Sequence, residues 1–214
     1  MNIVIFGPPG AGKGTQSNII AKKYKLHQLS TGELLREEIK NNSTLGNKIS
    51  SIINNGNLVS DEVVGGLIEN HVSKEKYKNR LIFDGYPRNL VQANNLNQLL
   101  KKNNQKIDLV LKLSVNLETI IKRISVRKNL EKREDDNEKI AIKRYQTYEN
   151  NIKPLVDFYN KSNLLKVVNG ETSVDEISDE ISGLIDAIKG WLYDVWQYKY
   201  AENKLLKLWL VLQE

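Results

Sequence analysis

The sequence predicts an α/β fold in which a parallel five-stranded sheet is flanked by helices. Short apolar runs bounded by turn residues occur at 3–6, 80–84, 107–113 and 164–168, with a weaker run at 27–30. Segments with helical spacing lie between them, including 16–24, 91–100, 117–126 and 140–159. Strands that alternate with helices indicate a parallel sheet covered on both faces. The ligand is then expected at the carboxyl ends of the strands.

The first strand leads directly into a glycine-rich loop. Residues 7–15 read GPPGAGKGT, a complete GxxxxGK[ST] pattern between the apolar run and the first helical segment. Glycines let the backbone fold around a phosphate chain, and the N–H groups at the start of the following helix point at the anion. Lys13 supplies a positive charge and Thr15 a hydroxyl near a metal ion. A glycine-rich turn could also arise by chance, but a complete motif between a strand and a helix is specific. We therefore expect a nucleotide-binding site.

The composition favours one main domain and restricts the cofactors. A chain of 214 residues can bury one sizeable core. It has no cysteine, and His27 and His71 lie far apart, so we expect no zinc site. The expected metal is magnesium that is carried by the substrate. No apolar stretch reaches the roughly 18 residues that span a bilayer. Residues 1–6 enter the first strand at once, so we expect no signal peptide, no membrane partner and a cytoplasmic protein.

The basic residues are informative through the few that are arginine. The net charge is +6, yet the lysines are interspersed with acidic residues, so we expect no nucleic-acid partner. Arginine suits positions that need a planar, bidentate phosphate donor or a stacking surface. Seven of the 32 basic residues are arginines: Arg36, Arg80, Arg88, Arg123, Arg127, Arg133 and Arg144.

Two segments depart from the alternation of strands and helices. Segment 31–59 holds two helix-like pieces, 32–39 and 45–53, and no convincing strand, so it is interpreted as an inserted helical flap. Segment 127–136 is polar throughout and is expected to be an exposed lid or connector.

Five motifs together resemble the adenylate kinase family over residues 1–188. They are GPPGAGKGTQ at 7–16, STGELLR at 30–36, LVSDEVV at 58–64, FDGYPRN at 83–89 and REDDNEKIAIKR at 133–144. The resemblance implies a P-loop NTPase-type sheet with a helical insertion at 30–59 that binds the nucleoside monophosphate, and a short lid at 123–136. The core would comprise 1–29, 60–122 and 137–189. The implied reaction is reversible, Mg²⁺-dependent transfer of the γ-phosphoryl group of ATP to AMP, giving two ADP, by a monomeric core.

The resemblance also implies residue roles. ATP would be bound by Gly10, Ala11, Gly12, Lys13, Gly14, Thr15, Arg123, Arg127 and Thr172. AMP would be bound by Thr31, Gly32, Arg36, Asn57, Leu58, Val59, Gly85, Arg88, Gln92, Arg133 and Arg144. The catalytic set would be Lys13, Asp84, Arg88, Arg123, Arg133 and Arg144. Thr15 and Asp84 would hold Mg²⁺, largely through water.

Physical arguments accompany these roles, and simpler readings stay open. Asp84 ends a strand and would face the phosphate loop, although an aspartate in an Asp-Gly-Tyr-Pro turn is also ordinary turn chemistry. Gln92 lies four residues after Arg88, on the same helical face, and its amide can both donate to and accept from the Watson–Crick edge of adenine. The lid-side arginines could instead pair with acidic neighbours on a solvated surface.

Two features depart from the family pattern. Only the five residues 128–132 join Arg127 to Arg133, which resembles the short-lid form but lacks its usual glycines, while 130–132 resemble the end of a long lid. Family members usually end near residue 188, whereas residues 190–214 form an apolar extension with helical spacing that carries all three tryptophans. This tail could pack on the core, bind a partner or itself, lie at a membrane surface, or be an altered end.

Two alternative functions remain open from the sequence. One is a UMP/CMP-type nucleoside monophosphate kinase, which shares the phosphate loop and the Asp-Gly-aromatic-Pro-Arg motif; Thr31 and Gln92 favour adenine. The other is a catalytically weak nucleotide-sensing module in which the tail binds a partner.

Overall fold

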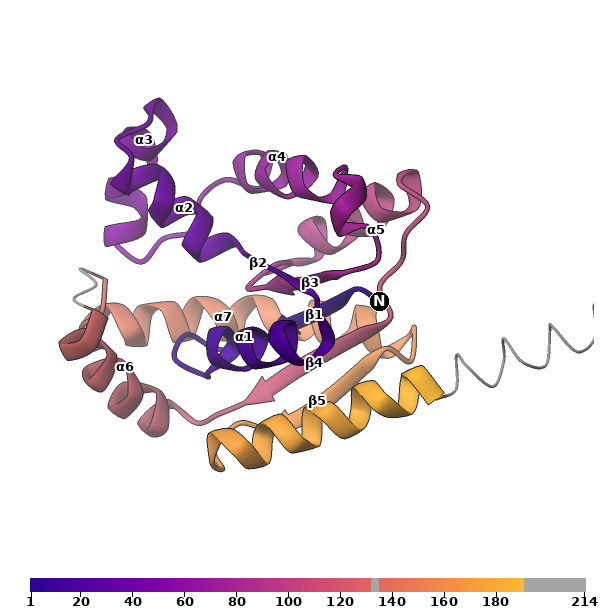
Figure 1. The fold of residues 1–214 in the computed structure, drawn as a ribbon. Coiled ribbons are helices and arrows are strands. Elements are labelled where there is room, and N and C mark those ends of the chain that lie inside the picture. The colour runs from indigo at the N-terminus through magenta and orange to yellow at the C-terminus, as the bar shows by residue number, and fades with distance from the viewer. Residues whose placement is uncertain (132–134, 191–214) are drawn as a thin grey trace, which may run out of the picture.

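The computed structural model describes residues 1–131 and 135–190, so the predictions for Arg133 and for the tail at 191–214 lie outside it. A single sheet of five parallel strands has the order β2-β3-β1-β4-β5 (Figure 1). Its strands are β1 (Ile3–Phe6), β2 (His27–Ser30), β3 (Leu81–Asp84), β4 (Leu109–Ser114) and β5 (Leu165–Asn169). The predicted fold class is confirmed, and each strand lies where an apolar run predicts it.

Helices cover both faces of the sheet, because side chains of a strand alternate between the faces. Val4 and Phe6 pack against α4 (Asp61–Val72), α5 (Leu90–Lys102) and α7 (Glu138–Asn160). Ile3 and Ile5 pack against α1 (Lys13–Tyr24), α6 (Leu117–Glu131) and the helical residues 174–190. In Figure 1, α4 and α5 lie above the sheet and residues 174–190 below it. The central strand β1 is therefore apolar along its whole length, and all four of its residues are buried.

The flap consists of α2 (Thr31–Lys40) and α3 (Thr44–Asn54), which pack against each other at one end of the molecule (Figure 1). The Ser43 side chain caps α3 by accepting a hydrogen bond from the Gly46 N–H group. Segment 31–59 contains no strand, as predicted. Helix α2 starts directly at the end of β2, so the flap begins at the carboxyl edge of the sheet.

Helix α4 is absent from the sequence prediction. Adjacent glycines at 65 and 66 lower helix propensity. Val64, Ile68 and Val72 are nevertheless buried at spacings of four on one face of the helix. Tertiary packing of this apolar stripe therefore outweighs the local preference.

The prediction of an exposed polar connector at 127–136 is wrong for part of that segment. Helix α6 continues to Glu131, and Asp135 and Asp136 are buried, with 5% and 1% of their surface exposed. Arg144 forms an ion pair with Asp135, and Arg127 forms a bidentate one with Asp136. The paired guanidinium groups allow these carboxylates to lie in the interior. Within the part of the chain that is described, no helix has the length and apolar character needed to cross a bilayer.

Candidate active site

The phosphate loop joins β1 to α1 at the carboxyl edge of the sheet. Gly10 and Gly12 have φ angles of 80° and 92°, in the left-handed region that favours glycine. Helix α1 begins at Lys13 with Gly12 as its N-cap, and no side chain caps it. The first N–H groups of α1 are therefore available to an anion, as the loop motif predicts.

Lys13 is half-buried and held in place by the loop itself. Its Nζ donates hydrogen bonds to the backbone oxygens of Gly7 and Pro8, at 2.8 Å each. The pKa of Lys13 is lowered to about 8, mainly by burial; Asp84 offsets part of this effect, and Arg88 and Arg144 contribute to it. The ammonium group thus lies among like charges and would be stabilised by a polyanion.

Asp84 ends β3 and faces the start of α1. A Cβ placed on Gly14 would lie 3.6 Å from Asp84 Oδ2, and the same oxygen accepts a hydrogen bond from Gln28 Nε2 at 3.1 Å. Thr15 follows Gly14 in the chain and is exposed. Among the described residues, no group of three His, Cys, Asp or Glu side chains could hold a metal by itself. One carboxylate and one hydroxyl fit Mg²⁺, which keeps several waters and takes few protein ligands.

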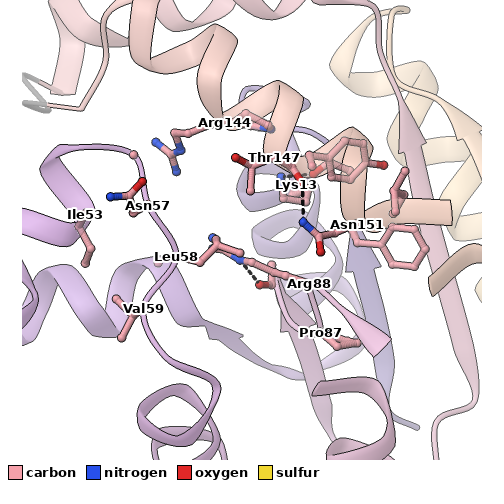
Figure 2. A pocket seen from close by; sticks show the side chains of 18 of the residues that line it. Lys13, Ile53, Asn57, Leu58, Val59, Pro87, Arg88, Arg144, Thr147 and Asn151 are labelled. Atoms are coloured by element: carbon pink, nitrogen blue, oxygen red, sulfur yellow. Dashed lines mark hydrogen bonds between the residues drawn. The ribbon is translucent and has the colours of Figure 1, made fainter. Parts of the chain in front are cut away.

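A cavity lies between the flap, the phosphate loop and α7, and we call it the flap cavity. Arg88 and Arg144 project into the space between the flap residues Asn57 and Leu58 and helix α7 (Figure 2). Thr147 and Asn151 of α7 form the opposite wall, and Lys13 is in its floor. Apolar residues complete the walls: Leu35, Ile53, Val59, Pro87, Ile152 and Leu155.

Arg88 is anchored by the turn that follows β3. Its Nε donates to the Gly85 carbonyl oxygen at 2.7 Å, and the same oxygen accepts a hydrogen bond from the Thr31 hydroxyl at 3.1 Å. The Arg88 pKa is lowered to about 10, mainly by burial and also by Arg144 and Arg36, while Asp84 offsets part of this effect. The guanidinium group stays protonated at neutral pH.

A second, wider cavity surrounds the outer side of the phosphate loop, and we call it the loop cavity. Its wall comprises residues 9–16, with Asp84 from β3 and Arg123, Val126, Arg127 and Leu130 from α6. Val174 and Ile177 close another side. Four cationic side chains line both cavities: Lys13, Arg36, Arg88 and Arg144. Two ligands placed in these cavities would therefore meet at a cluster of positive charge.

The comparisons with known proteins agree with this geometry. The family model described as adenylate kinase matches residues 5–164. A protein from Pelagibacter ubique (strain HTCC1062) that is described as adenylate kinase is 41% identical over 211 residues, covering 86% of this chain and 99% of the relative. The chain belongs to the adenylate kinase family. Another adenylate kinase, from Archaeoglobus fulgidus, is 35% identical over 216 residues, with 88% of this chain and 100% of the relative covered.

Most residues that the adenylate kinase resemblance singles out are brought together. The phosphate-loop residues, Asp84, Arg123 and Arg127 line the loop cavity, and Asn57, Leu58 and Val59 line the flap cavity. Gly32, Arg36, Gly85, Arg88 and Arg144 line both. Of the described residues in the predicted set, Thr31, Gln92 and Thr172 lie outside both walls. Thr31 and Gln92 are buried directly behind them, whereas Thr172 is exposed.

The three described lid-side arginines, Arg123, Arg127 and Arg144, hold protein partners in this structure. Arg127 donates to Asp136 from Nε and Nη2, at 2.7 and 2.5 Å, and Arg144 pairs with Asp135. Arg123 Nη1 donates to the Ala11 carbonyl oxygen at 3.4 Å, next to the phosphate loop. The acidic pairing that the sequence left open is thus present, while the same arginines also face the cavities.

Several site residues were missed from the sequence. Thr147, Tyr148 and Asn151 follow Arg144 at helical spacing, so the position of one arginine would have identified them. Gln28 supports Asp84 and Asp61 supports Gln92, at 3.1 and 2.6 Å. The residues in these two contacts are separated by 56 and 31 positions in the sequence, so no local sequence pattern predicts the contacts.

Proposed function

We propose that this protein is an adenylate kinase that transfers the γ-phosphoryl group of MgATP to AMP, reversibly, and gives two ADP. The observation that carries the proposal is the meeting of the two cavities at Lys13, Arg36, Arg88 and Arg144. A protein that only binds one nucleotide needs one phosphate site, whereas phosphoryl transfer between nucleotides needs two sites that share a charged boundary.

The loop cavity suits ATP. The first N–H groups of α1 and the Lys13 ammonium would contact the β- and γ-phosphates. Arg123 and Arg127 come from one face of α6, at a spacing of four residues. Val126 and Leu130 are exposed on the same helix and would offer an apolar surface to the base.

The flap cavity suits AMP. Arg36, Arg88 and Arg144 would hold its phosphate, because guanidinium groups bind phosphate oxygens bidentately. Leu35, Val59 and neighbouring apolar residues would enclose the base. Gln92 lies just behind this wall, hydrogen-bonded to the Arg88 backbone N–H, and its remaining donor and acceptor would contact the adenine edge.

Catalysis in this arrangement consists of positioning and charge stabilisation. An oxygen of the AMP phosphate attacks the γ-phosphorus of ATP, the bond from that phosphorus to the bridging oxygen breaks, and ADP leaves. Lys13 and the arginines stabilise the negative charge on the transferring group without donating a proton. Removing one such contact typically slows a reaction by roughly 10²–10³.

Asp84 and Thr15 are the residues that would hold Mg²⁺ together with phosphate oxygens. When bound, the ion neutralises charge on the phosphates of ATP. Gln28 keeps one Asp84 oxygen engaged, which fixes the direction of the carboxylate. Arg123 and the other lid-side cations, including Arg133 outside the described residues, would complete the enclosure.

Closure of the flap would exclude water from the transferring group. The flap already touches α7, since Lys143 Nζ donates to the Asn55 carbonyl oxygen at 2.9 Å. Water in an open site would hydrolyse ATP, so an enclosed site favours transfer. We also propose that the enzyme acts on the adenine nucleotides of the cytoplasm, as a monomer in its core, without nucleic-acid or membrane partners.

The decisive test is a panel of acceptors with MgATP in a coupled assay for ADP. AMP is expected to be the fastest acceptor, because the flap cavity lies beside an amide that can read adenine. Faster turnover of UMP or CMP would identify the UMP/CMP-type enzyme. Tight ATP binding without ADP formation from any acceptor would instead support a nucleotide-sensing module.

A further inference from the structure

Behind the flap cavity, a chain of hydrogen bonds fixes the direction of the Gln92 amide. The backbone N–H of Arg88 donates to Gln92 Oε1 at 2.8 Å, and Gln92 Nε2 donates to Asp61 Oδ1 at 2.6 Å. A backbone N–H can only donate, and an ionised carboxylate can only accept. Both partners therefore require the same orientation of the Gln92 amide.

Asp61 is itself held firmly. Asn89 Nδ2 lies 3.1 Å from both Asp61 oxygens, and the Asn89 side chain also caps α5 by accepting from the Gln92 backbone N–H at 2.8 Å. Asp61 occupies the first turn of α4, where the helix dipole favours a negative charge. Gln92 is only 2% exposed, so solvent cannot substitute for either partner.

The anchored amide has one donor and one acceptor left. A primary amide offers two N–H groups and two carbonyl lone pairs, and Arg88 and Asp61 use one of each. A 6-aminopurine presents a donor at its exocyclic nitrogen and an acceptor at N1. A 6-oxopurine presents the reverse, an acceptor at the exocyclic oxygen and a donor at N1.

We propose that Asp61 is a positioning residue that makes the acceptor site select 6-amino over 6-oxo purine nucleotides. A 6-oxopurine held in the same place would require the Gln92 amide to rotate by half a turn. Rotation would place Oε1 against the Asp61 carboxylate and the NH₂ group against the Arg88 N–H. The inference rests on the proposed function, in which Gln92 contacts the acceptor base.

The test compares AMP and IMP as acceptors in the Asp61→Asn variant. An asparagine amide can offer Gln92 either an oxygen or an NH₂ group, so Asp61→Asn removes one of the two contacts that oppose rotation of the Gln92 amide, and the Arg88 N–H remains as the other. The ratio of kcat/KM for AMP to that for IMP is expected to fall by about ten- to a hundredfold. The KM for ATP is expected to stay within a fewfold, because Asp61 does not line the loop cavity.

Two further variants separate selectivity from general damage. Asp108→Asn removes another largely buried carboxylate, which accepts from the Asn2 backbone N–H at 2.8 Å beside the amino-terminal end of β4, and should leave the ratio unchanged. Asn89→Ser keeps a cap for α5 but removes the donors that hold Asp61, so the ratio should fall in the same direction by less. This second variant tests the idea even if Asp61→Asn folds poorly.

The outcomes are distinguishable. Equal losses with AMP and IMP in the Asp61 and Asn89 variants, or an unchanged ratio in both, would overturn the role of Asp61. If Gln92→Ala lowers the ratio and the other two variants do not, Gln92 reads the base but Asp61 does not orient it. Absence of AMP phosphorylation in the unmodified enzyme would refute the proposed function itself.

Discussion

At the scale of residues, the site concentrates positive charge before any substrate binds. Burial is the main cause that lowers the pKa values of Lys13 and Arg88; Arg144 lowers both further, and Arg88 also lowers that of Lys13. Asp84 offsets part of this repulsion. A bound polyphosphate would relieve it and would raise the Lys13 pKa.

This charge distribution predicts that ATP affinity falls as the pH rises through about 8. Below the pKa of about 8 in the free enzyme, Lys13 is already protonated. Above it, binding must also take up a proton, because the phosphates raise the pKa. Calorimetry from about pH 7 to about pH 10, in two buffers of different ionisation enthalpy, would measure proton uptake. Lys13→Arg should show neither effect, and a pH-independent affinity in the unmodified enzyme would contradict the prediction.

Local motifs predicted many of the residues that line the two cavities, because these residues are neighbours in sequence as well as in space. The positions of Gly12 and Lys13 are set by one loop, and the position of Asp84 is set by the end of one strand. Gln28 and Asp61 could not be predicted this way. Their partners are brought near by the pairing of β2 with β3 and by the packing of α4 on α5.

At the scale of elements, the flap and α7 are in close contact at Gly56. This residue has a φ of 71°, and a Cβ there would lie 2.8 Å from Ile140 Cγ2 and 3.2 Å from Arg144 Cγ. Together with the Lys143 hydrogen bond, the contact brings the flap loop against the helix that carries Arg144. The flap cavity therefore depends on the absence of a side chain at one position.

Gly56→Ala is accordingly expected to raise the KM for AMP by about tenfold, since a left-handed conformation costs a non-glycine residue roughly 1–2 kcal/mol and the new methyl group would displace Ile140. The KM for ATP should change little. Steady-state kinetics with each substrate varied would measure both. Gly66→Ala is the control: it adds a methyl group in open space on α4 and should stabilise that helix by about 0.5–1 kcal/mol. Equal effects on both KM values in Gly56→Ala would argue against a flap-specific contact.

Elements were predicted best where their pattern is continuous. Strand β1 is an uninterrupted apolar run, β3 and β4 are mostly apolar, and α7 extends over 23 residues. Helix α4 was missed because its two glycines conceal an apolar stripe, and the buried acids at 135 and 136 were misjudged because their partners come from α6 and α7. Polarity in a sequence predicts exposure only when no opposite charge is placed beside it.

At the scale of the whole molecule, residues 174–190 belong to the core. Ile177, Ile181 and Ile185 are buried at spacings of four against the face of the sheet that α1 also covers. Gln16 of α1 reaches the start of this helix, with Nε2 donating to the Val174 carbonyl oxygen at 2.9 Å. The last described helix thus supports the helix that follows the phosphate loop.

Ile181→Ala is therefore expected to lower the free energy of unfolding by about 2–5 kcal/mol, because it leaves a cavity in a fully buried site. Urea denaturation of the full chain would measure the change, and both KM values should stay within a fewfold of those of the unmodified enzyme. Val167→Ala, at a residue 58% exposed on β5, should change stability by no more than about 0.5 kcal/mol. Similar losses in the two variants would mean that residues 174–190 contribute little to the core.

Asp84, at the end of β3 and in the wall of the loop cavity, lies only four residues before Arg88, which lines both the loop cavity and the flap cavity. The spacing between the donor and the acceptor is thus set by covalent bonds within one short stretch of chain. Movements of the flap can admit or enclose a substrate without altering that spacing. The backbone between residues 84 and 88 therefore limits how far the two cavities can separate, whatever the position of the flap.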